Sequence, residues 1–208
     1  MPLLLKHKDA ACLWGVWQMS EAYEDLCASL PPAMVAEAEN RFQAPHRRQE
    51  WLSVRALLRE LAAGRDCEIH YQPSGKPYLL DASTSISISH TRGYVAVILG
   101  QKPVGIDIEQ YGSRVHKVAS RFMRTDEMAA PYDGDDTWSL LLHWSAKETM
   151  FKCLDKTEVD FQEHLRIFPF TPVRQGVFHA REYKTACRRT FFIHYLLHPD
   201  FVLTWQVG

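Results

Sequence analysis

Three short segments in the middle of the chain have the pattern of β-strands. Residues Ser85–Ser89 alternate strictly between serine and isoleucine, which is typical of a strand with one apolar face. Tyr94–Leu99 is an apolar run of strand length, and Val104–Glu109 follows it after the turn residues Gly100–Pro103. The pattern therefore predicts strands of the antiparallel type, connected by tight turns.

Two longer segments have the periodicity of helices. In His46–Ala63 the apolar residues recur at helical spacing, and Gly64 is a natural C-terminal stop. Trp138–Cys153 is the strongest helical pattern of the second half. Further helices are expected at Ser20–Ala28, from Ala33 onward and at Val115–Met123, and further strands at Leu13–Met19 and after Phe161.

Each half of the 208-residue chain therefore combines helices with antiparallel-type strands. This length is sufficient for one large domain or two small ones, and for a substantial core. We expect an α+β fold with two halves, residues 1–100 and 101–208, within one compact unit.

Charge and composition exclude several classes of protein. The net charge of −1 gives no global field that would attract a nucleic acid or a membrane surface. The five cysteines are scattered without a C-x-x-C pair, which argues against a disulfide framework or a zinc site. The N-terminal leucine run is too short for a signal peptide, and no stretch approaches the roughly 18 apolar residues of a membrane span. We expect a cytoplasmic protein.

The strand Val104–Glu109 carries two carboxylates on one face. Residues two apart point to the same side of a strand, so Asp107 and Glu109 share one face while Ile106 and Ile108 pack inward. Neighbouring carboxylates repel unless a cation lies between them, and oxygen ligands suit magnesium. The alternative is an amphipathic strand with a solvated acidic face.

The helix Trp138–Cys153 carries a carboxylate on an apolar stripe. Leu141, Trp144, Glu148 and Phe151 fall on one side, where an unpaired charge is unfavourable. Lys152 lies one turn beyond Glu148 and is at the correct spacing to pair with it. The functional interpretation of Glu148 therefore competes with a structural salt bridge.

Arginines gather on and before the first-half helix. Arg48, Arg55 and Arg59 share one side, opposite the leucine stripe, and Arg41 and Arg47 add charge. Guanidinium groups match phosphate oxygens well. A solvated helix face is the alternative.

Two further candidate binding segments are a strand end and a turn. Ser89 and His90 end the alternating strand and offer a hydroxyl, an imidazole and backbone donors, and Gly75, Lys76 and Pro77 form a turn by composition. A serine-hydrolase interpretation is weak because the chain has no G-x-S-x-G motif.

The order of these features carries a family resemblance. The arginine helix is followed by the S-G-K-P turn, the I-S-H-T strand end, the G-I-D-I-E strand and the W-S-A-K-E-T-M-F-K helix. Between Arg41 and Lys152 the chain resembles the 4′-phosphopantetheinyl transferase superfamily, in its surfactin-synthetase-activating (Sfp-like) branch. The resemblance implies a pseudodimer of two similar α+β halves, with coenzyme A and the active site between them. The length of the chain separates it from the short trimeric branch, and we expect a monomer.

The resemblance also implies roles for individual residues. Asp107 and Glu109 match the acidic pair that binds Mg²⁺, and Glu148 matches the third acidic residue, which ligates the metal or activates the nucleophile. Lys152 matches a lysine near the transferred phosphate, and His90 matches a histidine at the 3′-phosphate of coenzyme A.

The remaining matches are to the nucleotide end of coenzyme A. Gly75–Pro77 matches a loop near the adenine. Arg48 is the best match to a phosphate-binding arginine, with Arg41 and Arg47 as alternatives. Thr91 replaces the serine of many relatives, and no lysines before Arg41 clearly match those that help to bind the nucleotide in some of them.

The predicted reaction is magnesium-dependent transfer of 4′-phosphopantetheine from coenzyme A to a serine of an apo-carrier protein, which releases adenosine 3′,5′-bisphosphate. The carrier belongs to an acyl, polyketide or peptidyl system. Glu148 is the candidate general base, and Lys152 stabilises the phosphates. Two alternatives are a non-catalytic module that binds coenzyme A or the carrier, and a magnesium-dependent hydrolase of a nucleotide pyrophosphate.

Overall fold

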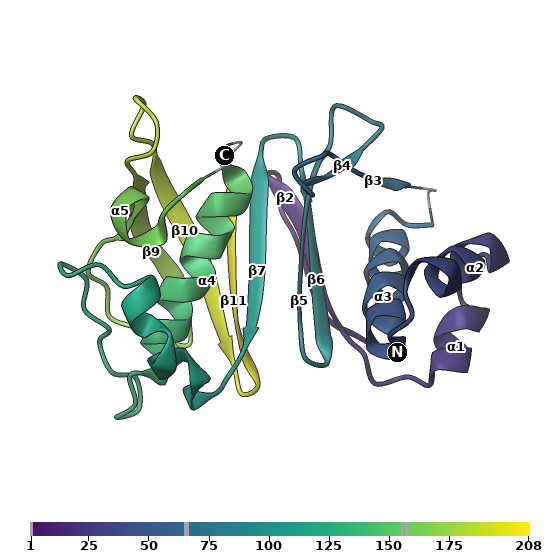
Figure 1. The fold of residues 1–208 in the computed structure, drawn as a ribbon, viewed down its shortest axis with the longest axis horizontal. Helices are drawn as coiled ribbons and strands as arrows, with labels where there is room; N and C mark the ends of the chain where they lie inside the picture. The colour runs from purple at the N-terminus through teal and green to yellow at the C-terminus, as the bar shows by residue number, and fades with distance from the viewer. Residues whose placement is uncertain (1, 65–66, 155, 157) are drawn as a thin grey trace. The chain divides into compact units, whose positions relative to one another are not determined.

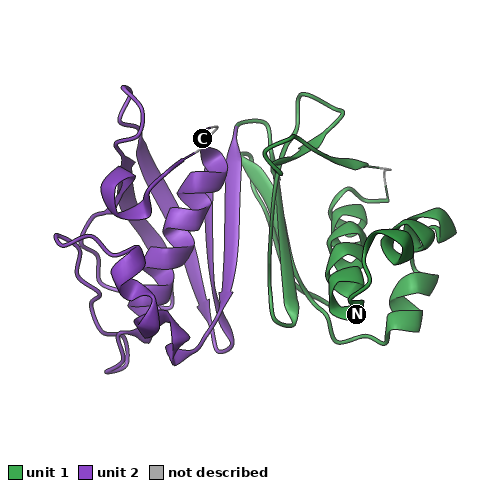
Figure 2. Cartoon of the chain, viewed as in Figure 1, with its two compact units in different colours: residues 1–102 green, residues 103–208 purple. Residues whose placement is uncertain are grey.

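The helices and strands fall into two groups along the chain in this computed structural model, which describes residues 2–64, 67–154, 156 and 158–208 (Figure 1). Unit 1 is Met1–Lys102 and unit 2 is Pro103–Gly208 (Figure 2). This division falls two residues after the boundary expected from the sequence. Helices and antiparallel strands occur in both units, which confirms the α+β class.

Unit 1 is built on a four-stranded antiparallel sheet with the order β1-β2-β6-β5. These strands are β1 (Leu3–Lys8), β2 (Cys12–Gln18), β5 (Ser85–Thr91) and β6 (Tyr94–Gly100). A separate ribbon pairs β3 (Ile69–Tyr71) with β4 (Pro77–Leu79). The helices are α1 (Tyr23–Ala28), α2 (Pro32–Arg41) and α3 (Pro45–Leu61).

The core of unit 1 lies between α3 and the sheet. Leu57, Leu58 and Leu61 of α3 are buried in one cluster with Val95 and Val97 of β6. The apolar residues whose spacing predicts this helix are therefore the ones that pack against the strands.

Unit 2 contains a five-stranded antiparallel sheet with the order β7-β11-β10-β9-β8. Its strands are β7 (Val104–Gln110), β8 (Leu165–Ile167), β9 (Gln175–Glu182), β10 (Thr190–His198) and β11 (Phe201–Val207). Its helices are α4 (Thr137–Cys153) and the short α5 (Phe161–His164), and two 3₁₀ helices follow β7, η1 (Ser113–Lys117) and η2 (Ala119–Arg121).

Helix α4 packs directly against β7 and β11. A Cβ atom on Gly105 would lie 2.4 Å from the carbonyl oxygen of Thr149 and 2.7 Å from Cys153 Sγ. Only glycine allows this approach, so the first strand of unit 2 lies unusually close to the helix.

The two units share one order of elements. In each, the strand before the helices (β2 or β7) leads to a helical region whose main helix has 17 residues (α3 or α4). The chain then forms a terminal hairpin whose last strand pairs antiparallel with that strand, in the orders β2-β6-β5 and β7-β11-β10.

The structure differs from the sequence-based expectation in several segments, and the β3–β4 ribbon is one of them, because only a turn at Gly75–Pro77 was predicted there. The N-terminal Leu3–Lys8 is a strand that was not predicted. Val115–Met123 forms η1 and η2 in place of a single helix, and only Val115 and Phe122 of this segment are buried, which is little apolar packing to stabilise a longer helix. Among the described helices, none combines the length and apolarity needed to span a bilayer.

Candidate active site

Strand β7 and helix α4 bring the predicted carboxylates of unit 2 to one interface. Asp107 is buried at 3% exposure, and Glu109 and Glu148 are half-buried. Ile106 and Ile108 point to the other face of the strand and are fully buried. Asp107 and Glu109 thus lie on the face that contains the helix contact, so the acidic face is not a solvated one.

The carboxylates of β7 are bonded to side chains of α4. Lys152 Nζ donates to Asp107 Oδ1 at 2.8 Å and to the carbonyl oxygen of Ile106 at 2.9 Å. Trp144 Nε1 donates to Glu109 Oε1 at 2.7 Å. The sequence suggested a pair within the helix between Lys152 and Glu148, whereas the ammonium group reaches across to the strand.

Two of these carboxyl groups are difficult to ionise. Burial, followed by the charge of Asp107, raises the pKa of Glu109 to about 7, although the Trp144 hydrogen bond opposes the shift. Burial and the same Asp107 charge also raise the pKa of Glu148 to about 7, against the attraction of Lys152. A divalent cation would relieve this repulsion, and an all-carboxylate donor set fits Mg²⁺.

The carboxylate oxygens of Asp107, Glu109 and Glu148 do not all lie close to one another. Within the described residues, three potential ligand atoms lie within 4.8 Å of one another at two other places, which are His7 with Asp9 and Cys12, and His116 with Asp135 and Asp136. The trio of Asp107, Glu109 and Glu148 is not that close.

A chain of buried hydroxyls fixes α4 against the sheet below the carboxylates. Thr204 Oγ1 of β11 lies 2.8 Å from Ser145 Oγ and 2.7 Å from Thr149 Oγ1. All three side chains are fully buried, and Thr204 is the β11 partner of Asp107. This contact sets the register between the residues of α4 and the acidic strand.

Lys147, the neighbour of Glu148, is a structural cation that the sequence analysis missed. Its Nζ is fully buried and donates to Glu127 Oε2 at 2.7 Å and to the carbonyl oxygens of Phe122 and Phe161 at 2.6 and 3.1 Å. Burial lowers its pKa, and Glu127 opposes that shift. The available signal was a lysine on the core side of a helix whose neighbours are apolar.

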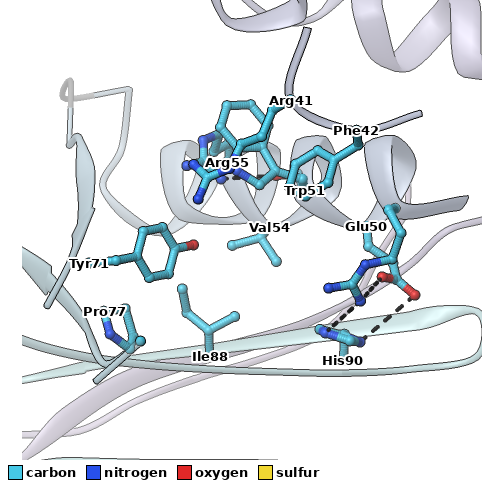
Figure 3. Close-up of a pocket in the computed structure, with 12 residues that line it drawn as sticks. Arg41, Phe42, Glu50, Trp51, Val54, Arg55, Tyr71, Pro77, Ile88 and His90 are labelled. Carbon is cyan, nitrogen blue, oxygen red and sulfur yellow. Dashed lines mark hydrogen bonds and ion pairs between the residues drawn. The ribbon is translucent and has the colours of Figure 1, made fainter. Parts of the chain in front are cut away.

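Unit 1 contains a separate cavity of about 320 Å³ between α3 and the sheet edge (Figure 3). Gly75, Pro77 and His90 line it, as does Tyr71. Gly75 has a φ of +84°, which glycine adopts without strain, and its amide closes the turn onto the carbonyl of Gln72 at 2.8 Å. Of the remaining predicted binding residues, Lys76 lies within this turn and Ser89 is buried in β5 at 7% exposure.

The structure separates the arginines into three environments. Arg41 and Arg47 line the cavity. Arg48 instead donates from Nε to the carbonyl oxygen of Phe42 at 2.6 Å, which secures the loop between α2 and α3. Arg55 lies in the cavity wall and is buried.

Arg55 is a buried cation, not part of a solvated helix face. Its guanidinium carbon lies 3.1 Å from the centroid of the Trp51 ring, and Nη1 donates to the Trp51 carbonyl oxygen at 3.2 Å. Burial lowers the pKa of Arg55 to about 10, a shift opposed by its hydrogen bond and charge interaction with Tyr71. A flat guanidinium–aromatic wall of this kind suits a planar ligand group.

Comparison with known proteins finds a family match to one of the two units. A search of curated proteins finds no match to the chain. Residues 103–205, nearly all of the unit that carries Asp107, Glu109, Glu148 and Lys152, match the family model of the 4′-phosphopantetheinyl transferase superfamily.

Proposed function

We propose that the protein transfers 4′-phosphopantetheine from coenzyme A to a serine of an apo-carrier protein. The family match over residues 103–205 supports phosphopantetheine transfer in general. The observation that carries the finer proposal is the interface of β7 and α4, where Asp107, Glu109, Glu148 and Lys152 form one acidic and basic cluster inside the matched region. A protein that only bound coenzyme A would have no need to maintain two half-buried carboxyls with raised pKa values.

Asp107, Glu109 and Glu148 are the residues that would hold Mg²⁺. A bound Mg²⁺ would neutralise charge on the pyrophosphate of coenzyme A during the reaction.

Glu148 is the proposed general base. A half-buried carboxylate beside the proposed metal site can accept a proton from a hydroxyl group that binds there. It takes the proton of the carrier serine hydroxyl as the serine oxygen bonds to the β-phosphorus of coenzyme A. The bond from that phosphorus to the bridging oxygen breaks, and adenosine 3′,5′-bisphosphate leaves with the electron pair. Lys152, held by Asp107 and the Ile106 carbonyl, supplies positive charge to the phosphate oxygens.

The cavity of unit 1 is the proposed site for the adenosine 3′-phosphate end of coenzyme A. Its volume of about 320 Å³ is in the range of small-molecule sites. His90, Arg47 and Arg41 provide cationic or donor groups, and Arg55 with Tyr71 provides a planar wall.

The shared order of elements supports the proposal that the chain is a pseudodimer of two similar halves. Because one chain contains both halves, we propose that it works as a monomer, which size-exclusion chromatography with light scattering would test.

Intact-mass spectrometry of apo-carrier proteins tests the function. A panel of acyl, polyketide and peptidyl carriers is incubated with the protein, coenzyme A and Mg²⁺, and one or more should gain the mass of phosphopantetheine. A reaction without carrier separates the alternatives: release of free phosphopantetheine there would indicate a hydrolase. Binding of coenzyme A with neither product would indicate a binding module.

A further inference from the structure

An acidic residue, Glu50, lies among the basic residues of the unit 1 cavity. It belongs to α3 and lines the cavity near His90 (Figure 3). Arg47 lines the same cavity. Glu50 Oε2 lies 2.8 Å from Arg47 Nη1, and Oε1 lies 3.8 Å from His90 Nδ1. Arg47 Nη1 in turn lies 3.5 Å from His90 Nε2. One carboxylate therefore contacts both side chains with a different oxygen for each.

The three side chains differ in how much of their surface is exposed to solvent. The side chain of Glu50 is 18% exposed, whereas those of Arg47 and His90 are 47% and 42% exposed. Long, exposed side chains have many rotamers, and fixing them at a ligand costs conformational entropy. A less exposed carboxylate that contacts both reduces that cost before the ligand arrives.

The geometry leaves donors for a ligand. Glu50 and His90 both meet Arg47 through Nη1, so the rest of the planar guanidinium is not used by this pair of contacts. A guanidinium presents five N–H donors in a fixed fork that matches a phosphate group. The opposing effect is repulsion between Glu50 and the ligand phosphate, and the half-exposed site screens that repulsion.

We propose that Glu50 is a positioning residue that holds Arg47 and His90 side by side for the 3′-phosphate of the nucleotide. The inference deepens the proposed function and rests on it, since it assumes that the cavity receives the phosphorylated adenosine of coenzyme A. A carboxylate in an anion site would then favour anion binding, which is the opposite of its direct Coulomb effect.

Isothermal titration calorimetry with two nucleotides tests the proposal. Adenosine 3′,5′-bisphosphate carries the 3′-phosphate, and adenosine 5′-monophosphate lacks it. Glu50→Gln should weaken binding of the bisphosphate roughly fivefold, the upper end for an exposed ion pair, and leave the monophosphate nearly unchanged. Glu50→Asp, which keeps the charge, should retain more of the preference than Glu50→Gln.

A double-mutant cycle and a matched control isolate the role of the contact. In an Arg47→Ala background, Glu50→Gln should have little further effect, because the partner that it positions is gone. Glu60→Gln is the control: Glu60 lies on the same helix, outside the cavity, and contacts Lys6 at 3.5 Å. It should bind both nucleotides like the wild type.

The outcomes separate failure of this proposal from failure of the proposed function. If the wild type shows no preference for the bisphosphate, the cavity is not the 3′-phosphate site. That result would overturn both the role of Glu50 and the assignment of this cavity in the proposed function. If the wild type prefers the bisphosphate and Glu50→Gln binds it equally or more tightly, only the role of Glu50 is overturned. Equal losses for both nucleotides would show a purely structural residue and overturn it as well.

Discussion

Units 1 and 2 place different chemistry on the same order of elements. Strand β2 of unit 1 (Cys12–Gln18) has no charged residue, whereas its counterpart in unit 2, β7 (Val104–Gln110), has two carboxylates. The main helix of unit 1 carries arginines around a cavity, and that of unit 2 carries Glu148 and Lys152 toward the acidic strand. The shared strand order determines which positions of the strand and the helix face each other, and the residue types at those positions determine the chemistry of each unit.

The strand–helix contact itself also differs. Strands β2 and β7 each have a glycine that faces the main helix of their unit. A Cβ on Gly15 would meet Leu57 Cδ1 at 3.0 Å and the Leu5 carbonyl oxygen at 3.2 Å, but one on Gly105 would meet the backbone oxygen of Thr149 at 2.4 Å. The closer approach in unit 2 is what lets the lysine of α4 bond to the carboxylate of β7.

Removal of divalent metal should have the largest effect, and only on the chemistry of unit 2. Carrier modification should stop in chelator and return with Mg²⁺ or Mn²⁺, while Ca²⁺ should serve poorly because it prefers a larger, looser shell. Binding of adenosine 3′,5′-bisphosphate to the unit 1 cavity should persist in chelator. Full transfer in metal-free buffer would refute the assignment of the acidic trio.

Glu148→Gln should reduce turnover by at least about 100-fold, the range for loss of a general base or a metal ligand. The KM for coenzyme A should change far less, because the nucleotide is assigned to unit 1. Thermal stability should stay level or rise, since a half-buried carboxyl whose pKa is raised to about 7 is replaced by a neutral group. Near wild-type turnover would return Glu148 to a structural role.

Gly105→Ala and Gly15→Ala together test the difference in strand–helix distance. The unit 2 variant has to displace the helix backbone at Thr149, so we expect about 3 kcal/mol of destabilisation and a loss of transfer activity. In the unit 1 variant the nearest atom is the tip of a leucine side chain, which can move, so we expect about 1 kcal/mol. Equal losses in thermal unfolding would contradict the closer packing of β7 on α4.

Most elements could be predicted from the sequence because their apolar residues recur at the positions that are buried in the fold. It placed the helix around Trp51 and the alternating strand Ser85–Ser89 within a few residues of α3 and β5. It missed β1, whose side chains are only partly buried, and so its pattern has no clean alternation.

Partners across elements were harder to predict than positions along one element. Local spacing offers Glu148 as the partner of Lys152, but the packing of α4 on β7 presents Asp107 instead. The sequence leaves Arg55 open between a phosphate-binding role and a solvated helix face, because its stacking on Trp51 and its place in the cavity depend on tertiary packing. Long-range contacts of this kind leave no signal in the spacing of a single helix.

His90→Ala tests whether the unit 1 cavity is specific for the 3′-phosphate. A hydrogen bond to a charged group contributes roughly 1.5–3 kcal/mol, or about 10- to 150-fold. The variant should lose much of its kcat/KM with coenzyme A and little with 3′-dephospho-coenzyme A, in a cycle with the ligand as one partner. Equal losses with both substrates would remove His90 from the site and leave Arg47 and Arg41 as the next residues to test.

The smallest expected effect concerns pH and a buried histidine of unit 2. His143 is 2% exposed, and it is the only fully buried histidine among the residues that the structure describes. Burial lowers its pKa from 6.5, against a hydrogen bond to the Ser139 carbonyl and the charge of Glu127, and Lys147 lowers it further. The folded protein therefore holds His143 neutral at a pH where the unfolded chain already binds a proton.

Stability should consequently fall as the pH drops below 6.5, because the unfolded state takes up a proton that the native state excludes. The loss from this residue is at most about 1.4 kcal/mol per pH unit. His143→Gln, which keeps a donor for the Ser139 carbonyl, should have a free energy of unfolding that falls less than that of the wild type between pH 7 and pH 5.5. His70→Gln in unit 1 is the control, since His70 is partly exposed, and it should follow the wild type. Parallel curves of unfolding free energy against pH for the wild type and His143→Gln would show that His143 is protonated in the folded protein. In that case His143 would not make unit 2 more sensitive to acid than unit 1.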